Sequence, residues 1–345
     1  MEKNIFHIKS FSKKPAPLDI AIVGATGLVG RELLSLLETS PLPISSLSLF
    51  ASDTSKGKEI FFRKKKILVD SLTKKSLEKK DLIFFATKRK ISQKFIPFAA
   101  KTKAICIDSS SFFRMNKNVP LIIPEINPHL IEQTQNIFSS PNCTTTLMLL
   151  PLFPLHQAFT IRRIVACTYQ SASGGGKKLM DLLKKDTQKY LISNAFPSYP
   201  SYGFNLFLHD SPIEDNDYNK EEMKMVKETR KILSNDKIKI SATCVRVPIF
   251  RVHSISVNVE FEKNICLFQA KNLLKNMSGI TFFDGKQFPT PKLAERKKNV
   301  FVGRLRKDIS QENTLELWIV GDQLLKGAAL NALQIAEKLF FAKKR

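Results

Sequence analysis

The alternation of apolar and polar positions divides the chain near residue 161 into two parts. In the first part, short apolar runs at 19–24, 47–52, 81–87 and 104–110 end on small or polar residues, and leucines at helical spacing follow the first run. Strands that alternate with helices predict a parallel, doubly wound sheet, with ligand groups at the carboxyl ends of its strands.

The second part predicts a second sheet. Stretches rich in Val, Ile and Thr at 162–174, 238–262 and 314–322 are typical of strands, and residues 219–233 have the pattern of a charged amphipathic helix. A strong final helix from residue 326 is expected to return and pack on the first part. The chain of 345 residues is therefore predicted to be an α/β protein with two domains.

Composition narrows the class of protein. With 43% hydrophobic and 25% charged residues, the chain should be globular, and its apolar runs are too short to span a membrane. Residues 1–18 lack the apolar centre of a secretory signal and are predicted to be a flexible lead-in. Five scattered cysteines without a CxxC pair argue against a disulfide framework or a metal site and favour a reducing compartment, the cytoplasm.

The formal net charge of +24 does not by itself identify a partner. Nucleic acid, a membrane surface and anionic small molecules would all suit a basic protein. The lysines are spread along the chain without interleaved aromatic residues. The favoured interpretation is a solvated basic face, with neither nucleic acid nor membrane as a partner.

A glycine triplet follows the first predicted strand. Gly24, Gly27 and Gly30 allow a tight turn and close helix packing, so a pyrophosphate could sit on the helix N-terminus. The alternative is a strand–helix turn without a ligand. The loop at 52–58 offers Asp53 for a ribose hydroxyl, but also Ser, Thr and Lys side chains that suit a 2′-phosphate, so it leaves NAD and NADP open.

Cys143 stands at the start of a predicted helix, after Pro-Asn and before three threonines. Such a cysteine is commonly a small buried side chain. At a helix N-terminus, however, the macrodipole favours the thiolate and so a nucleophile. Among the histidines, His209 is expected to have a packing or surface role. His253, seven residues after Arg246, is the candidate partner in a cysteine–histidine pair.

Residues 168–176 form a third candidate site. Gln170 closes a predicted strand, and Ser173 with the three following glycines opens what reads as a helix. Exposed N–H groups there would suit an oxyanion or a carboxylate. A flexible strand–helix hinge is the alternative, with equal weight.

Taken in order, these motifs resemble aspartate-semialdehyde dehydrogenase. The resemblance covers about residues 19–340 and rests on "GATGLVG", "SSPNCTTT", "TYQSASGGG", "EEMKMVKETRKIL", "RVPIFRVHS" and "WIVGDQLLKGAALNA". It implies a Rossmann-like dinucleotide-binding domain at 19–142, an α+β catalytic and dimerisation domain at 143–325, and a C-terminal helix at 326–345. It also implies a homodimer or a dimer of dimers.

The resemblance implies roles for the motif residues. Cys143 would be the nucleophile, His253 the acid/base, and Gln170 the group that orients the substrate. The substrate would be bound by Arg246 at its α-carboxylate, Glu221 at its amino group, Arg114 and Lys224 at its phosphate, and Asn142 beside the cysteine. The cofactor would contact Gly24, Ala25, Thr26, Gly27, Leu28, Val29, Ser52, Thr54, Ser55, Ser173, Gly174 and Gln323.

The implied reaction is the NADPH-dependent reduction of aspartyl phosphate to aspartate semialdehyde through a cysteine thioester. Its product would lead toward lysine and diaminopimelate, methionine and threonine. Two alternatives stay open. N-acetyl-glutamyl-phosphate reductase shares the reaction type, although its "PGCY" turn is "PNCT" here, and a basic binding protein could keep the scaffold without catalysis.

Three departures from the family pattern lie on the cofactor side. Thr54 stands where the family has an arginine for the NADP phosphate, and Lys56 is the substitute point charge. Residues 86–93 replace a glycine-serine loop, which puts Lys88 and Arg89 there, and Gln323 replaces an asparagine. NADP is the expected cofactor, and NAD stays open.

Overall fold

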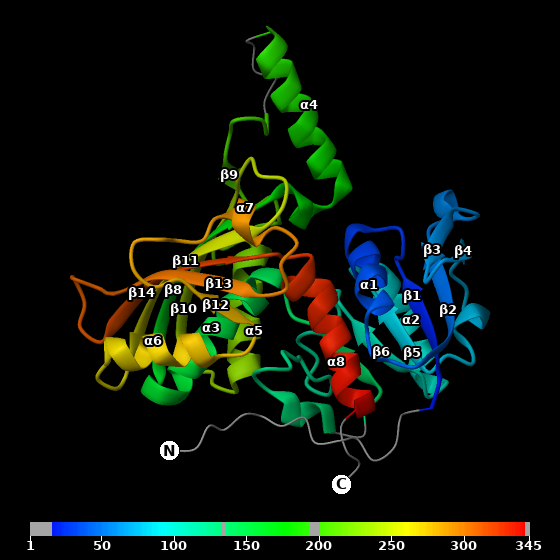
Figure 1. The fold of residues 1–345 in the computed structure, drawn as a ribbon, viewed down its shortest axis with the longest axis horizontal. Helices are drawn as coiled ribbons and strands as arrows, with labels where there is room; N and C mark the ends of the chain where they lie inside the picture. Colours follow the sequence, from blue (N-terminus) through cyan, green and yellow to red (C-terminus); the bar gives the residue numbers. More distant parts are fainter. Residues whose placement is uncertain (1–15, 133–134, 194–200, 342–345) are drawn as a thin grey trace.

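The computed structural model describes residues 16–132, 135–193 and 201–341. Two seven-stranded sheets lie on either side of the C-terminal helix (Figure 1). Most of the predicted lead-in and the last four residues fall outside the described residues. The predicted lead-in ends too late, at residue 18, because Leu18 is buried and already begins the first strand.

The first sheet is parallel except at one edge, and the predicted alternation of strands and helices is confirmed. Its strand order is β3-β4-β2-β1-β5-β6-β7, with only β3 and β4 antiparallel. The elements are β1 (Leu18–Val23), α1 (Leu28–Glu38), β2 (Ile44–Ala51), β3 (Glu59–Phe62), β4 (Lys65–Ser71), β5 (Leu82–Phe85), α2 (Arg89–Lys101), β6 (Ile105–Asp108) and β7 (Ile137–Ser139).

The hairpin of β3 and β4 was not predicted from the sequence. Its turn consists of Arg63 and Lys64, both at positive φ, and Lys65 and Lys66 begin the returning strand. The alternation of buried and exposed side chains that marks a strand is therefore weak in β4. It is clear at Val69, which is buried while its neighbours are not. The run of basic residues is not typical of a strand, so the sequence did not indicate this short strand pair. It lies at the edge of the sheet, where charged side chains are tolerated.

The second sheet is mixed, with the order β12-β13-β14-β11-β8-β10-β9. Its strands are β8 (Ile161–Gln170), β9 (Phe207–Leu208), β10 (Lys239–Arg246), β11 (His253–Phe261), β12 (Ile280–Phe282), β13 (Val300–Lys307) and β14 (Thr314–Gly321). The single stretch expected at 238–262 is two strands on opposite sides of β8, one parallel to it and one antiparallel. The end of β10 and the start of β11 consequently lie at the same edge of the sheet.

The helices of the second part are α3 (Cys143–Phe159), α4 (Lys177–Ser193), α5 (Lys220–Leu233), α6 (Leu267–Asn276) and the short α7 (Pro291–Ala294). Helix α3 packs into the apolar core of the second sheet, together with residues of α5 and α6. Helix α4 projects away from the body of the molecule (Figure 1). Among the described residues, no helix is both long and apolar enough to cross a membrane.

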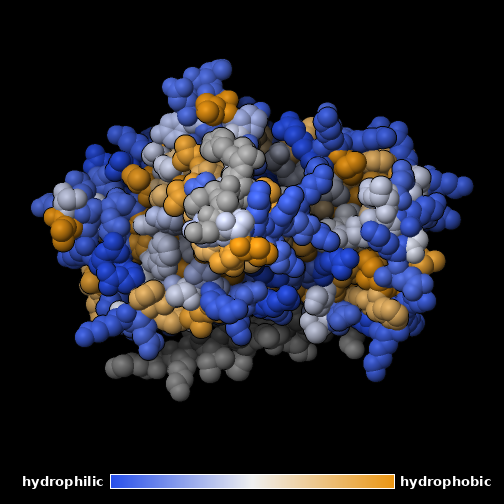
Figure 2. All heavy atoms as spheres, turned by 90° about the horizontal axis from the view of Figure 1, so that it is seen from above, coloured by the Kyte–Doolittle hydropathy of each residue, from blue (hydrophilic) through white to orange (hydrophobic). Residues whose placement is uncertain are grey.

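The C-terminal helix returns to the first sheet, as predicted. A π-helical turn, Leu325–Ala329, leads into α8 (Leu330–Phe341), and residues such as Leu333 and Ile335 share a core with Ile20 and Phe84. Figure 2 shows hydrophilic side chains over both halves of the upper face, with smaller hydrophobic patches between them. On this face hydrophilic side chains are not confined to one half.

Candidate active site

Three candidate residues lie at one edge of the second sheet because of strand register. Gln170 at the end of β8 pairs with Arg246 at the end of the parallel strand β10. On the other side of β8, Ser254 of β11 pairs with Tyr169, which places His253 beside the same strand end. All three side chains are buried, with 1%, 3% and 0% of their residue surface exposed.

Cys143 is the first residue of α3, as its sequence context predicted. The helix is capped by Asn142, whose side-chain oxygen accepts a hydrogen bond from the Thr144 N–H at 3.0 Å. Gly327 of the π-helical turn packs directly against the cysteine, since a Cβ on this glycine would lie 2.8 Å from the Cβ of Cys143. The Cα and Cβ of Cys143 are therefore held between the helix N-cap and the π-helical turn.

The protonation of Cys143 differs from the expectation. Burial raises the pKa of the thiol to about 12, and the negative charge of Glu221 acts in the same direction. Part of Cys143 remains accessible, but the protein atoms around it are dense enough for desolvation to dominate. The helix N-terminus was expected to favour the thiolate. In the protein without substrate, the effect of burial on the pKa of the thiol is larger than the effect of the helix N-terminus.

Alkylation of the free protein should report this raised pKa. The thiolate fraction is small at neutral pH, so the rate of modification by iodoacetamide at Cys143 is expected to rise about tenfold per pH unit from about pH 7 to 10, without a plateau. Mass spectrometry of the Cys143 peptide measures the rate. A plateau below pH 8 would show instead that the helix stabilises the thiolate.

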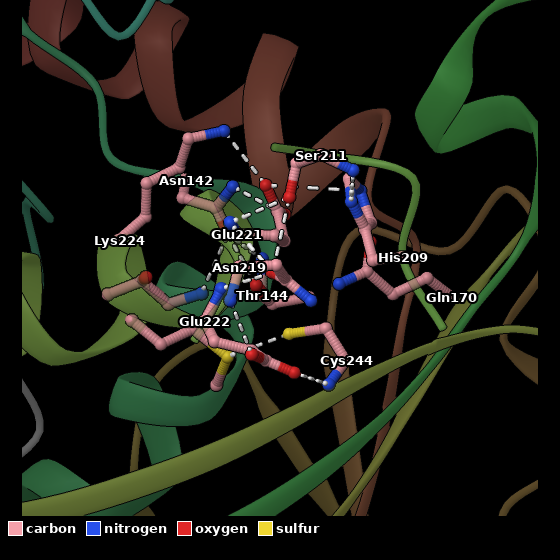
Figure 3. A network of polar contacts seen from close by, with 12 residues as sticks. Asn142, Thr144, Gln170, His209, Ser211, Asn219, Glu221, Glu222, Lys224 and Cys244 are labelled. Atoms are coloured by element: carbon pink, nitrogen blue, oxygen red, sulfur yellow. Dashed lines mark hydrogen bonds and ion pairs between the residues drawn. The ribbon is translucent and has the colours of Figure 1, made fainter. Parts of the chain in front are cut away.

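A buried polar network joins the start of α3 to the start of α5 (Figure 3). The Asn142 side-chain amide donates to Glu221 at 2.9 Å, and Lys224 donates to the other oxygen of the same carboxylate at 2.8 Å. Burial alone would raise the pKa of Glu221, but Lys224 and other donors hold it at about 2. The carboxylate is therefore charged and lies close enough to act electrostatically on Cys143.

Arg114 reaches this site from the first part of the chain. Its Nε donates to the Ser140 carbonyl at 3.1 Å, its Nη2 to the Ser109 carbonyl at 2.8 Å, and its Nη1 to Glu228 at 3.0 Å. Glu228 also accepts the backbone N–H of Asn142 at 2.6 Å. Each guanidinium nitrogen already has a protein acceptor, and one N–H on each of the two terminal nitrogens is left for an anion.

The hydrogen bonds of His253 define its tautomer. The backbone N–H of Ser171 donates to Nδ1 at 3.0 Å, and a backbone amide can only donate. The neutral ring therefore carries its proton on Nε2, which is buried and has no hydrogen-bond partner among the described residues. Burial lowers the pKa of His253 to about 3, with Arg246 as a further cause, so the ring is neutral near pH 7.

The segment after β8 closes the site. It forms a short 3₁₀ helix, Ala172–Gly175, before α4. A Cβ on Gly174 would lie 2.9 Å from Cε1 of His253 and 3.0 Å from Nη1 of Arg246. Gln323 donates to Ser173 and accepts the backbone N–H of Val252 at 2.9 Å, which ties this segment to the residue before His253.

The glycine turn fits a dinucleotide. A Cβ on Gly24, which has φ +92°, would lie 2.3 Å from the Ala86 carbonyl oxygen, and one on Gly30 would lie 2.2 Å from the Gly24 oxygen. Helix α1 begins at Leu28 with Gly27 as its N-cap, no side chain caps it, and its first turn contains no acidic residue. Its N-terminus is thus available to a pyrophosphate.

The predicted cofactor residues of the first part of the chain lie at or near this turn. Thr26 donates to Ser55 at 3.4 Å, and Ser52 and Thr54 hydrogen-bond to each other at 2.9 Å on the exposed surface. Lys56 is exposed and forms a surface ion pair, at 3.4 Å from Asp70. Ala25 is buried beneath the turn, and Leu28 and Val29 begin α1.

Two residues of the site were missed by the sequence interpretation. His209 was expected to pack or lie on the surface, but its Nε2 is 2.7 Å from Arg246. Glu228 was not singled out, although it lies seven residues after Glu221 and so on the same face of α5. The helical spacing could have indicated Glu228, whereas only the three-dimensional arrangement brings His209 to Arg246.

Comparisons with known proteins match both parts of the chain. Residues 19–134 match the model of the semialdehyde dehydrogenase NAD binding domain, and residues 152–326 match that of the semialdehyde dehydrogenase dimerisation domain. Aspartate-semialdehyde dehydrogenases from Prochlorococcus marinus and Synechocystis are 43% and 44% identical to this chain. These alignments cover 94% of it and 96% and 98% of the relatives.

A solved structure agrees with the sequence relatives. Aspartate semialdehyde dehydrogenase II from Vibrio cholerae has a TM-score of 0.91 at 39% identity, covering 94% of this chain and 98% of that one. Another structure of that protein is a complex with ASA, with the same TM-score and identity. The chain belongs to the aspartate-semialdehyde dehydrogenase family.

Proposed function

We propose that this chain catalyses the NADPH-dependent reduction of aspartyl phosphate to aspartate semialdehyde with release of phosphate. The observation that carries the proposal is the placement of Cys143 within electrostatic reach of Arg246, Glu221, Arg114 and Lys224. A charged amino acid with an acyl phosphate offers a negative carboxylate, a positive amino group and a negative phosphate. The site holds charges opposite to all three.

The first step is nucleophilic attack by the Cys143 sulfur on the acyl carbon. The carbon–oxygen bond to phosphate breaks, a thioester forms, and the proton of the thiol leaves with the phosphate as HPO₄²⁻. NADPH, when bound at the glycine turn, supplies the hydride that reduces this thioester. The sulfur then leaves as thiolate and the aldehyde is released. A thiolate suits both steps, because it is a strong nucleophile and a good leaving group.

In this proposal His253 stabilises the negative oxygen of the tetrahedral adduct, and Glu221 influences the pKa of the Cys143 thiol. The Nε2–H of His253 donates to the oxygen that becomes negative when the acyl carbon is tetrahedral, and Gln170 orients the same adduct. Pairing of Glu221 with the amino group of the substrate removes part of the negative field that raises the pKa of Cys143. This pairing acts in favour of the thiolate, whereas pairing of Arg114, Arg246 and Lys224 with the anionic groups of the substrate acts against it.

The remaining assignments belong to the same proposal. Arg246 binds the α-carboxylate, Glu221 the amino group, and Arg114 and Lys224 the phosphate, with Asn142 beside the nucleophile. The domain boundary between residues 142 and 143 also stays a prediction. We propose a homodimer, supported by the matched dimerisation domain, and a cytoplasmic location, supported by five cysteines that are all free.

The test follows the reverse reaction. With aspartate semialdehyde, inorganic phosphate and NADP, the absorbance of the reduced nicotinamide is expected to rise only when all three are present. N-acetyl-glutamate semialdehyde serves as the competing substrate, and its preference would support the alternative reductase. Folded protein without turnover on either aldehyde would overturn the proposal in favour of a binding protein.

Cofactor choice is expected to depend on Lys56, since Thr54 provides no charge. Replacing Lys56 by glutamine should raise the KM for NADPH about fivefold, as loss of one exposed ion pair costs about 1 kcal/mol, and leave the KM for NADH unchanged. Lys58→Gln, also exposed in the same loop, is the matched control. Equal changes for both cofactors in Lys56→Gln would place the 2′-phosphate elsewhere.

A further inference from the structure

His209 is held at the edge of the second sheet beside Arg246. Strand β9 pairs antiparallel with β10, with Phe207 opposite Arg246, and the backbone N–H of His209 donates to the Cys244 carbonyl at 2.8 Å. Because β10 also pairs with β8, the side chains of Gln170, Arg246 and His209 come from three neighbouring strand ends. The register of the sheet thus places His209 at the site.

Among the described residues, the contact between His209 and Arg246 is the shortest hydrogen bond of the guanidinium. Nε2 of His209 is 2.7 Å from Nη2 of Arg246. The other acceptors lie at 3.4 to 3.5 Å, namely Gln170, the Ser171 carbonyl and Asp210, and the Nε of Arg246 has no partner among the described residues. Arg246 is therefore oriented mainly by His209.

The contact with the Arg246 guanidinium determines which nitrogen of the His209 imidazole is unprotonated. Arginine only donates, so Nε2 of His209 must be an unprotonated acceptor. The Ser211 N–H lies 3.2 Å from Nδ1, but a neutral ring accepts at one nitrogen only, and the shorter contact to a charged donor is the stronger. Burial, the main cause, lowers the pKa of His209 and keeps the ring neutral near pH 7.

His209 also stands next to Glu221. Its Nε2 is 4.0 Å from a carboxylate oxygen of Glu221, and the Ser211 hydroxyl accepts the Glu221 N–H at 3.0 Å (Figure 3). The imidazole therefore lies between the two opposite charges assigned above to the α-carboxylate and the α-amino group. A buried arginine and carboxylate attract each other strongly, and a direct pair between them would occupy both binding groups.

We propose that His209 is a positioning residue for the amino-acid end of the substrate. It accepts a hydrogen bond from Arg246, turns the guanidinium toward the incoming α-carboxylate, and keeps it apart from Glu221. This inference rests on the proposed function. It concerns affinity for the amino-acid part and leaves the chemistry at Cys143 unaltered.

Kinetics of two variants test the proposal. His209→Leu removes the acceptor and should raise the KM for aspartate semialdehyde about 10- to 100-fold, with the KM values for phosphate and NADP and kcat within about threefold. His209→Gln places an amide oxygen near the position of Nε2 and should recover most of the loss. A purely structural role predicts instead that both variants lower kcat and raise all three KM values.

Binding separates this inference from the proposed function. L-2-aminobutyrate carries the α-amino and α-carboxylate groups without an aldehyde, and calorimetry measures its affinity even when the unmodified protein shows no turnover. Weaker binding in His209→Leu with recovery in His209→Gln supports the role of His209 in either case. Unchanged KM and unchanged affinity in His209→Leu would overturn it, as would absence of binding to the unmodified protein.

Discussion

Replacing Cys143 by serine is expected to lower the phosphate-dependent turnover of aspartate semialdehyde by a factor on the order of 10⁴ or more. The serine hydroxyl is a far weaker nucleophile than the thiolate. Its alkoxide is also a poor leaving group from the tetrahedral adduct. Serine keeps the size of the side chain, so the packing of Gly327 against this position and the N-cap by Asn142 should persist.

The measurement is the initial rate of reduced nicotinamide formation at saturating substrates. Cys167→Ser is the matched control, because Cys167 lies on β8 and is half-buried, yet belongs to no part of the candidate site. The control should retain nearly the full rate, and both variants should bind NADP as the unmodified protein does. Turnover above about a tenth of the original rate in Cys143→Ser would place the nucleophile at another residue.

Much of the site was predictable because its residues mark the ends of regular elements. Gln170, Arg246 and His253 each begin or end a strand, and Cys143 begins a helix, so short sequence motifs locate them. The resemblance to a family then implied roles for them. What the motifs did not contain was the pairing between strands, which alone brings the three strand ends to one edge of the sheet.

The features that were missed depend on that pairing or on burial. His209 has no motif of its own, and it reaches Arg246 only because the two-residue strand β9 pairs with β10. The pKa of Cys143 was misjudged because a helix N-terminus can be read from sequence, whereas the density of protein around the thiol cannot. Local signals thus predicted positions better than electrostatic states.

Replacing Gly174 by alanine is expected to lower kcat/KM about 100-fold, by displacement rather than by loss of a reacting group. The new methyl would lie 2.9 Å from Cε1 of His253 and 3.0 Å from both its Nε2 and Nη1 of Arg246. Something must move, and the buried imidazole and guanidinium are its nearest neighbours. A shift of about 1 Å in such groups commonly costs two orders of magnitude in rate.

The neighbouring Gly175 provides the matched control. The three atoms nearest to a Cβ there all belong to Leu179, a half-buried apolar side chain at 2.6 Å, and neither glycine has a positive φ. Both alanine variants therefore make the same change to the backbone of one short 3₁₀ helix, and of the two it is Gly174→Ala that places a methyl against His253 and Arg246. Steady-state kinetics should show a loss in Gly174→Ala and little change in Gly175→Ala.

The comparison also decides between two accounts of the glycine-rich segment. Equal losses in both variants would mean that the segment must flex as a hinge between β8 and α4, the alternative that the sequence left open. A loss confined to Gly174→Ala means that the glycine is required for space beside His253 and Arg246. The geometry favours space, because the Gly174 position is in contact with both side chains whereas Gly175 faces the start of α4.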